Sequence, residues 1–320
     1  MNYVRIKGWH SLSGNEAVID MEYILLENTL TKASQEGYEA AYQYLLEGSV
    51  KLPKGEHLRV DYFLMCLAAG SGRSDKALQH LEEAVLQKGY WFLQEELEDH
   101  DLTPLFENAK FLDLKAICEQ RQKTAQESAK PFCTYIDKTA SKLLLCIHGN
   151  GQNASISKKD WGFLEGGDLQ VEAVQSARVE SYGRFSWKYD NRDFRQIEEC
   201  VKKLPWEEYE KRILAGFSAG CDMILRTIVL SELDVEVLLL QSPCIPYFNE
   251  NAEEIVKVCR KKEIRVGIFC GELDEMCHDM AAGLYHRLIE AGATAFLVWQ
   301  PGLRHVFPDK GTENSYLEFL

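Results

Sequence analysis

The chain has 320 residues, enough for one large domain or two ordinary ones, and its composition is typical of a globular protein. It carries 36 basic and 50 acidic side chains, which argues against nucleic acid and anionic membrane surfaces as partners, because both bind basic patches. No 18 consecutive residues are all apolar, which argues against a membrane-spanning helix.

The cysteines and the N-terminal residues indicate a cytoplasmic protein. Met1–Asp20 lacks the apolar core of a secretory signal. The ten cysteines include no C-x-x-C pair, and several, such as Cys146 and Cys270, stand within apolar runs, as reduced and buried thiols do. Cys277 and His278 could suggest a metal site, but no second ligand pair at suitable spacing accompanies them. We therefore expect no metal and no cofactor.

The first part of the chain has a helical pattern. A short strand is possible near Tyr3–Ile6, and apolar residues recur at helical spacing from about Met21. Residues 37–45 and 73–81 align with matching alanines and leucines at an offset of 36 positions. This offset is close to the period of about 34 residues of tetratricopeptide repeats. Roughly residues 30–120 resemble such repeats, and the alternative is an unrelated helical bundle.

A change in composition and in the pattern of apolar residues indicates a domain boundary. Arg121–Lys130 is polar and rich in Gln, Ala and Ser, so we predict a helical domain over residues 1–128 and a second domain over 129–320. Beyond this stretch, short apolar runs alternate with amphipathic ones. The strand candidates are Phe132–Ile136, Leu143–Ile147, Val171–Val174, Arg212–Ala215, Val235–Leu240, Arg265–Phe269 and Ala295–Trp299. The helix candidates are Arg192–Lys203, Ala219–Leu230, Ala252–Lys261 and Met280–Ala291. The alternation predicts an α/β fold, a mostly parallel sheet with helices on both faces.

Residues 216–220 read Gly-Phe-Ser-Ala-Gly and form a G-x-S-x-G motif. An apolar strand-like run precedes the motif and an apolar helix-like run follows it, which is the context of a nucleophile elbow. The glycines allow the sharp turn that lifts Ser218 clear of the sheet. The alternative is an ordinary strand-to-helix turn.

Three more polar segments follow predicted strands, at the sheet edge where parallel α/β folds place their chemistry. They are residues 148–151 (His-Gly-Asn-Gly), 271–274 (Gly-Glu-Leu-Asp) and 301–305 (Pro-Gly-Leu-Arg-His). With the elbow, these segments resemble the α/β-hydrolase fold, and more closely its carboxylesterase and dienelactone-hydrolase branch. The resemblance covers about Phe132 to the end of the chain, and the order Ser, Asp, His is that of the fold.

The resemblance implies a catalytic triad of Ser218, Asp274 and His305. Ser218 would attack an acyl carbonyl, His305 would take its proton, and Asp274 would orient the imidazole. Glu272, Glu275 and Asp279 compete with Asp274, but only Asp274 fits the G-x-x-D spacing after the strand. His278 is nearer in sequence, yet it opens a helix and does not follow the last strand.

The oxyanion and substrate sites are also implied by the resemblance. Backbone N–H groups of Ala219 and Asn150 would bind the oxyanion, whereas His148 reads as structural. Residues 182–187, which end in Trp187, either line the substrate pocket or belong to the core.

We expect a serine hydrolase that cleaves a carboxylic ester or thioester, with a small-molecule substrate and no cofactor. The helical domain either forms one wall of the substrate entrance or binds a protein partner. The competing interpretation is an inactive hydrolase-fold scaffold whose helical domain docks a peptide.

Overall fold

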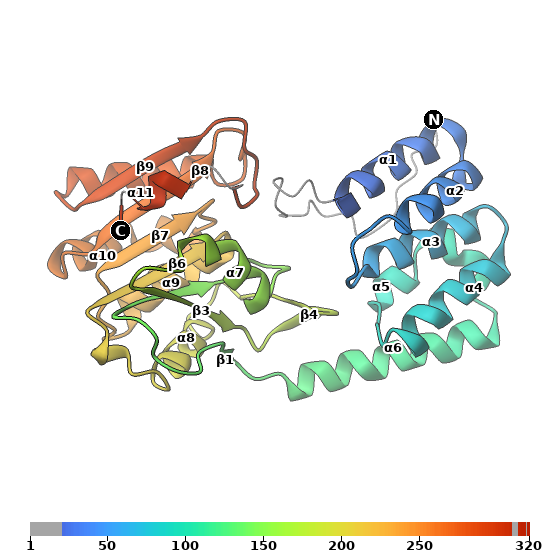
Figure 1. The fold of residues 1–320 in the computed structure, drawn as a ribbon, viewed down its shortest axis with the longest axis horizontal. Coiled ribbons are helices and arrows are strands. Elements are labelled where there is room, and N and C mark those ends of the chain that lie inside the picture. The colour runs from blue at the N-terminus through green and yellow to red at the C-terminus, as the bar shows by residue number, and fades with distance from the viewer. Residues whose placement is uncertain (1–20, 309–312, 318) are drawn as a thin grey trace. The chain divides into compact units, whose positions relative to one another are not determined.

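The computed structural model describes residues 21–308, 313–317 and 319–320. The strand expected near Tyr3–Ile6 lies outside these residues. The chain divides into two compact units, one ending at Ser128 and the other beginning at Ala129 (Figure 1). Within the described ranges, no helix combines the length and hydropathy needed to cross a bilayer. All ten cysteines are described, and all are free thiols.

Over its described residues, 21–128, the first unit contains helices and no strands, which confirms the predicted helical domain. Its elements are α1 (Met21–Glu36), α2 (Tyr38–Ser49), α3 (Leu58–Gly70), α4 (Ser74–Glu82), the π-helical turn η1 (Glu83–Gln87), α5 (Gln94–Leu97), the 3-10 helix η2 (His100–Leu105) and α6 (Ala109–Ser128). Helix α3 packs against both α2 and α4. The aligned residues Ala41 and Leu45 of α2, and Ala77 and Leu81 of α4, are all buried. Small alanines and buried leucines therefore occupy equivalent places in the two helices, while the tetratricopeptide likeness itself stays a prediction.

The polar stretch chosen for the boundary is not a linker over most of its length. Helix α6 continues through it to Ser128. The Arg121 guanidinium donates hydrogen bonds to the carbonyls of Val85 and Tyr90, at 2.6 and 2.9 Å, and so ties α6 to the body of the unit. Gln, Ala, Lys and Arg are good helix formers, so the composition used to place the boundary also suits an exposed helix.

The second unit contains a seven-stranded sheet in the order β1-β3-β2-β6-β7-β8-β9. Its strands are β1 (Phe132–Cys133), β2 (Lys142–Ile147), β3 (Leu169–Gln175), β6 (Lys211–Phe217), β7 (Val237–Gln241), β8 (Arg265–Gly271) and β9 (Ala295–Gln300). Only β1 pairs antiparallel, with β3, and the other pairs in this sheet are parallel. All seven strand candidates thus contribute to one sheet.

Helices cover both faces of this sheet, as expected (Figure 1). They are α7 (Ala154–Trp161), α8 (Phe194–Val201), α9 (Ala219–Leu230), α10 (Pro246–Lys261), α11 (His278–Glu290) and α12 (Glu313–Leu317). Leu143 and Leu145 of β2 point into the core beneath α8–α11, whereas Leu144 and Cys146 point to the opposite core with α7 and α12. Because both faces are buried, the strands read as continuous apolar runs.

Several short elements are not predicted from the sequence, among them α7, α12 and a hairpin. Helix α7 is polar, and its one clear signal is Asn153, whose side chain accepts a hydrogen bond from the Ile156 N–H as an N-cap does. The hairpin is formed by β4 (Val179–Ser181) and β5 (Arg184–Phe185), whose strands are too short to show a period.

Candidate active site

Ser218 stands at the junction of β6 and α9, in a strained backbone conformation. Its φ is +52° and its ψ is −120°, a region that side-chain-bearing residues rarely adopt. Gly220 makes the sharp turn possible, because a Cβ there would lie 2.3 Å from the Ile147 carbonyl oxygen. The turn presents the Ser218 hydroxyl at the carboxyl end of the sheet, above the N-terminus of a helix that favours negative charge.

The structure brings the three predicted triad residues together. The Ser218 hydroxyl donates a hydrogen bond to Nε2 of His305 at 2.8 Å. The Nδ1–H of His305 donates to Oδ2 of Asp274 at 2.9 Å. Ser218 and Asp274 are buried, and the His305 side chain is 18% exposed. A continuous hydrogen-bonded row therefore runs from the buried carboxylate to the serine oxygen.

Asp274 is held as a carboxylate by its neighbours. Its Oδ1 accepts the Cys277 backbone N–H at 3.1 Å. Burial raises the pKa of Asp274, but hydrogen bonds from His305 and Ser242 and the backbone N–H of Cys277 outweigh burial and lower it below its usual value. A permanently charged carboxylate here fixes the imidazole with its proton on Nδ1, leaving Nε2 free to accept one.

The competing residues lie elsewhere. Glu272, Glu275 and Asp279 are exposed. His278 is also exposed and stacks on the Trp299 ring, with the ring centroids 4.1 Å apart.

The loop expected to supply an oxyanion donor lies against the elbow. A Cβ on Gly149 would come within 2.9 Å of the Phe217 ring and 3.2 Å of the Ser218 Cβ. Among the described residues, the backbone N–H groups of Asn150 and Ala219 donate to no protein acceptor. Two N–H donors are thus left available on the segments that meet at Ser218.

Buried side chains hold this loop in place. The Trp187 indole N–H donates to the His148 carbonyl at 2.8 Å, and its ring packs on the His148 ring. The Trp187 backbone N–H donates to the Asn150 side chain at 2.7 Å. Trp187 is almost fully buried, so of the two roles left open for it the core fits, and the side chain supports the loop without facing solvent.

His148 is structural, as expected. Its Nδ1–H donates to the Gly149 carbonyl at 2.7 Å, and its Nε2 accepts the Ser176 backbone N–H at 3.2 Å. Complete burial lowers the pKa of His148 to about 4, so the ring stays neutral.

The neutrality of His148 predicts a pH-dependent stability. Between about pH 6.5 and pH 4 the unfolded chain protonates this residue and the folded chain does not, so acidification destabilises the fold, by about 3 kcal/mol in total. The variant His148→Gln lacks this contribution, so its stability deficit against the wild type should shrink as the pH falls through this window. Urea unfolding at several pH values measures it. The exposed His278→Gln serves as control, and a deficit of His148→Gln that stays constant with pH would contradict the argument.

A second prediction concerns the close approach of Gly149. The added methyl of Gly149→Ala must push the loop away from Phe217 and Ser218. If Asn150 on this loop supplies an oxyanion donor, misplacing it costs roughly 10²–10³-fold in kcat. We expect a fall of that size in ester hydrolysis. Gly162→Ala is the matched control, because a Cβ at Gly162 would meet no atom within 4 Å. Equal activity of the two variants would show that the loop is not part of the site.

Two thiols lie beside the triad. The sequence suggests no role for Cys244, and for Cys277 only a metal site with His278, which is not expected. The Cys277 sulfur lies 3.5 Å from Nδ1 of His305, and the Cys244 sulfur lies 3.3 Å from the Tyr189 hydroxyl. A hydrogen bond with Cys277 lowers the pKa of Cys244 to about 6, and the same bond together with burial raises the pKa of Cys277. The signal for Cys277 is its position three residues after Asp274, where the start of α11 turns back on the loop.

The chain is similar to one family model and to several solved structures. Residues 21–126 match the family model described as "A/B hydrolase-like, N-terminal domain". No curated protein matches the chain. An uncharacterized protein from Bacillus cereus ATCC 10987 is 27% identical, with 92% of this chain and 96% of that chain covered and a TM-score of 0.49.

Two named enzymes align with a smaller share of the chain. Esterase PE8 is 18% identical, covering 60% of this chain and 99% of its own, with a TM-score of 0.45. Zea mays acyl-protein thioesterase 2 is 14% identical, covering 59% and 98%, with a TM-score of 0.44. The predicted fold class, an α/β-hydrolase sheet preceded by a helical domain, is confirmed.

Proposed function

We propose that this protein is a serine hydrolase that cleaves a carboxylic ester or a thioester through an acyl-enzyme on Ser218. One observation carries the proposal: the Ser218 hydroxyl lies 2.8 Å from Nε2 of His305, whose other nitrogen is bound to the buried Asp274. This is the distance at which an imidazole can take the serine proton as the oxygen attacks. The match of residues 21–126 to an N-terminal domain of hydrolase-like proteins supports the same assignment.

The reaction follows from the positions of these groups. His305 accepts the Ser218 proton, the serine oxygen adds to the acyl carbonyl, and Asp274 stabilises the resulting imidazolium. The imidazolium then gives its proton to the departing alcohol or thiol. Water, activated by the same imidazole, releases the acid in the second half.

The negative charge that develops on the carbonyl oxygen in the transition state is stabilised by hydrogen-bond donors. We assign the backbone N–H groups of Ala219 and Asn150 to this role, because both are free of protein acceptors in the described structure and their segments meet at Ser218. Each such donor contributes about 3 kcal/mol to stabilising the transition state. The N-terminus of α9 adds a favourable dipole.

Apolar side chains around the site favour an apolar acyl or leaving group. Leu273 and Met276, on the loop that carries Asp274, are 49% and 57% exposed. Tyr189 is also exposed and contacts Cys244, whose backbone N–H donates to the Ser218 carbonyl at 3.3 Å. These residues offer an apolar surface to a substrate held at Ser218.

Labelling with a serine-reactive fluorophosphonate tests the proposal most directly. We expect the folded full-length chain to be labelled once, on Ser218, and to hydrolyse p-nitrophenyl esters or acyl thioesters. Mass spectrometry of the labelled peptide identifies the site. Absence of labelling in the folded protein, together with absence of ester and thioester hydrolysis, would instead favour an inactive scaffold whose helical domain binds a peptide.

A further inference from the structure

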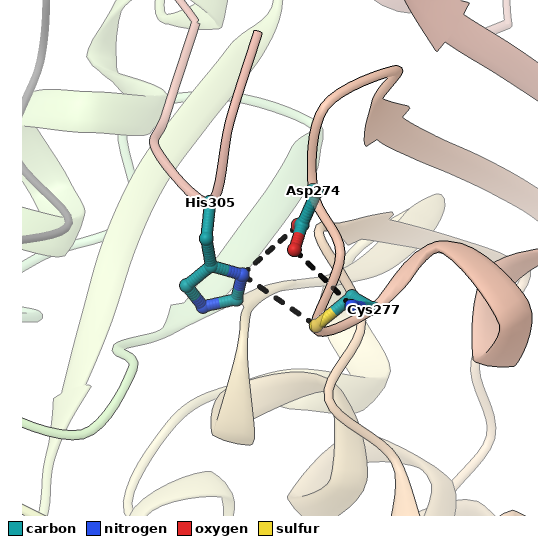
Figure 2. Close-up of side chains that lie close together, drawn as sticks. All are labelled: Asp274, Cys277 and His305. Carbon is teal, nitrogen blue, oxygen red and sulfur yellow. Dashed lines mark hydrogen bonds and ion pairs between the residues drawn. The ribbon is translucent and has the colours of Figure 1, made fainter. Parts of the chain in front are cut away.

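Three side chains of different chemistry converge at one point (Figure 2). Ser218 is next to them, because its hydroxyl is hydrogen-bonded to His305. They are the Asp274 carboxylate, the Cys277 thiol and the His305 imidazole, and one potential ligand atom from each lies within 4.8 Å of the other two. Nδ1 of His305 is directed at both partners, 2.9 Å from the carboxylate oxygen and 3.5 Å from the sulfur. A serine hydrolase needs only the carboxylate at this nitrogen, so the thiol is an additional feature of this chain.

Two of the three spacings are close to those of a tetrahedral zinc ion. Zinc binds imidazole nitrogen, carboxylate oxygen and thiolate sulfur at about 2.0–2.3 Å, which places any two ligand atoms about 3.3–3.7 Å apart. The distance from the Cys277 sulfur to Nδ1 of His305, 3.5 Å, already has this value. The distance from Nδ1 to the carboxylate oxygen, 2.9 Å, needs to open only slightly, because the ion replaces a proton between them.

The surroundings orient these ligands as zinc sites require. Oδ1 of Asp274 accepts the Cys277 backbone N–H, which ties two of the ligands to one turn. The Ser242 side chain also hydrogen-bonds the Asp274 carboxylate. Asp274 and Cys277 are buried, whereas the His305 side chain is 18% exposed. An ion therefore reaches the site past His305, which is the ligand that needs to move.

We propose that zinc, or another thiophilic divalent cation, binds Asp274, Cys277 and His305 and reversibly inhibits the protein. The inhibition rests on the proposed hydrolase function, whereas the binding does not. As the metal takes Nδ1, the imidazole proton moves to Nε2 and the Cys277 thiol proton leaves to solvent. Nε2 then becomes a donor and can no longer accept the Ser218 proton, so the nucleophile is not activated.

Cobalt(II), a spectroscopic substitute for zinc, tests the site without any assay of activity. We expect one equivalent added to the metal-free full-length protein to give a thiolate-to-cobalt charge-transfer band, which one equivalent of zinc removes. Cys277→Ala should lose the band. Cys133→Ala, which removes a partly exposed thiol from the edge strand β1, should keep it. Absence of the band in the wild type, or its persistence in Cys277→Ala, would overturn the proposal.

Inhibition of ester hydrolysis by zinc is the second readout. Removing a residue that only hydrogen-bonds a metal ligand weakens metal binding about 10–100-fold, and removing a ligand should weaken it at least as much. The zinc concentration that halves activity should therefore be at least about 10–100-fold higher for Cys277→Ala than for the wild type. Cys277→Ser provides a second variant if the alanine form melts at a lower temperature.

EDTA should restore the activity of the zinc-inhibited wild type. Recovery by a thiol reductant and not by EDTA would identify oxidation of the Cys244–Cys277 pair and overturn the metal assignment. A cobalt band in a chain that hydrolyses no ester would leave the metal site standing and reject the hydrolase.

Discussion

Ser218→Ala is expected to reduce hydrolysis of short p-nitrophenyl esters to background, a fall of roughly 10⁶-fold in kcat if the residue is the nucleophile. The fold should survive, because alanine keeps the Cβ of serine and so suits the φ of +52° no worse. Only the hydrogen bond from the hydroxyl to Nε2 of His305 is lost. Hydrolysis rates and thermal melting, measured on the same preparations, check both parts.

Ser231→Ala is the matched control for this experiment. Ser231 stands at the other end of the same helix, where its hydroxyl donates to the Thr227 carbonyl. This variant should keep full activity and lose at most about 1 kcal/mol of stability. Near wild-type hydrolysis by Ser218→Ala with an unchanged melting temperature would reject Ser218 as the nucleophile.

Asp274→Asn should lower kcat by roughly 10⁴-fold with little change in structure. The amide keeps the size of the carboxylate and still offers an oxygen to the Cys277 N–H. However, an amide can donate to the imidazole, which favours the tautomer with the proton on Nε2, and it supplies no charge to stabilise the imidazolium. The fall should appear in kcat, since Asp274 is buried and does not reach the substrate.

Asp279→Asn provides the comparison for Asp274→Asn. Asp279 lies five positions further on, in the first turn of α11, and its side chain is exposed. We expect its substitution to be nearly silent in steady-state kinetics. The reverse order, with Asp279→Asn impaired and Asp274→Asn active, would mean that Asp274 is not the carboxylate that orients His305.

Local sequence patterns determine much of this architecture. The seven apolar runs of the second unit become the seven strands because a sheet covered on both faces buries nearly every residue of its central strands, β2, β3, β6, β7 and β8. The G-x-S-x-G motif predicts the turn at Ser218 because glycine is needed where the backbone of Ile147 passes close to Gly220. The apolar runs depend on near neighbours and the motif is recognised by its spacing, so both can be read before the fold is known, although the contact that requires Gly220 comes from the distant strand β2.

Contacts between distant segments are decided by the tertiary structure alone. Ser218 and His305 are 87 positions apart, and they meet because β6 and β9 end at the same edge of the sheet. Burial distinguishes Asp274 from the exposed acidic residues around it, and burial of Trp187 places it against the loop of residues 148–151. The approach of the Cys277 thiol to His305 likewise depends on how the turn into α11 packs against the loop that follows β9. A sequence thus determines which elements form and which chemistry each carries, while the packing of the sheet decides which side chains share one site.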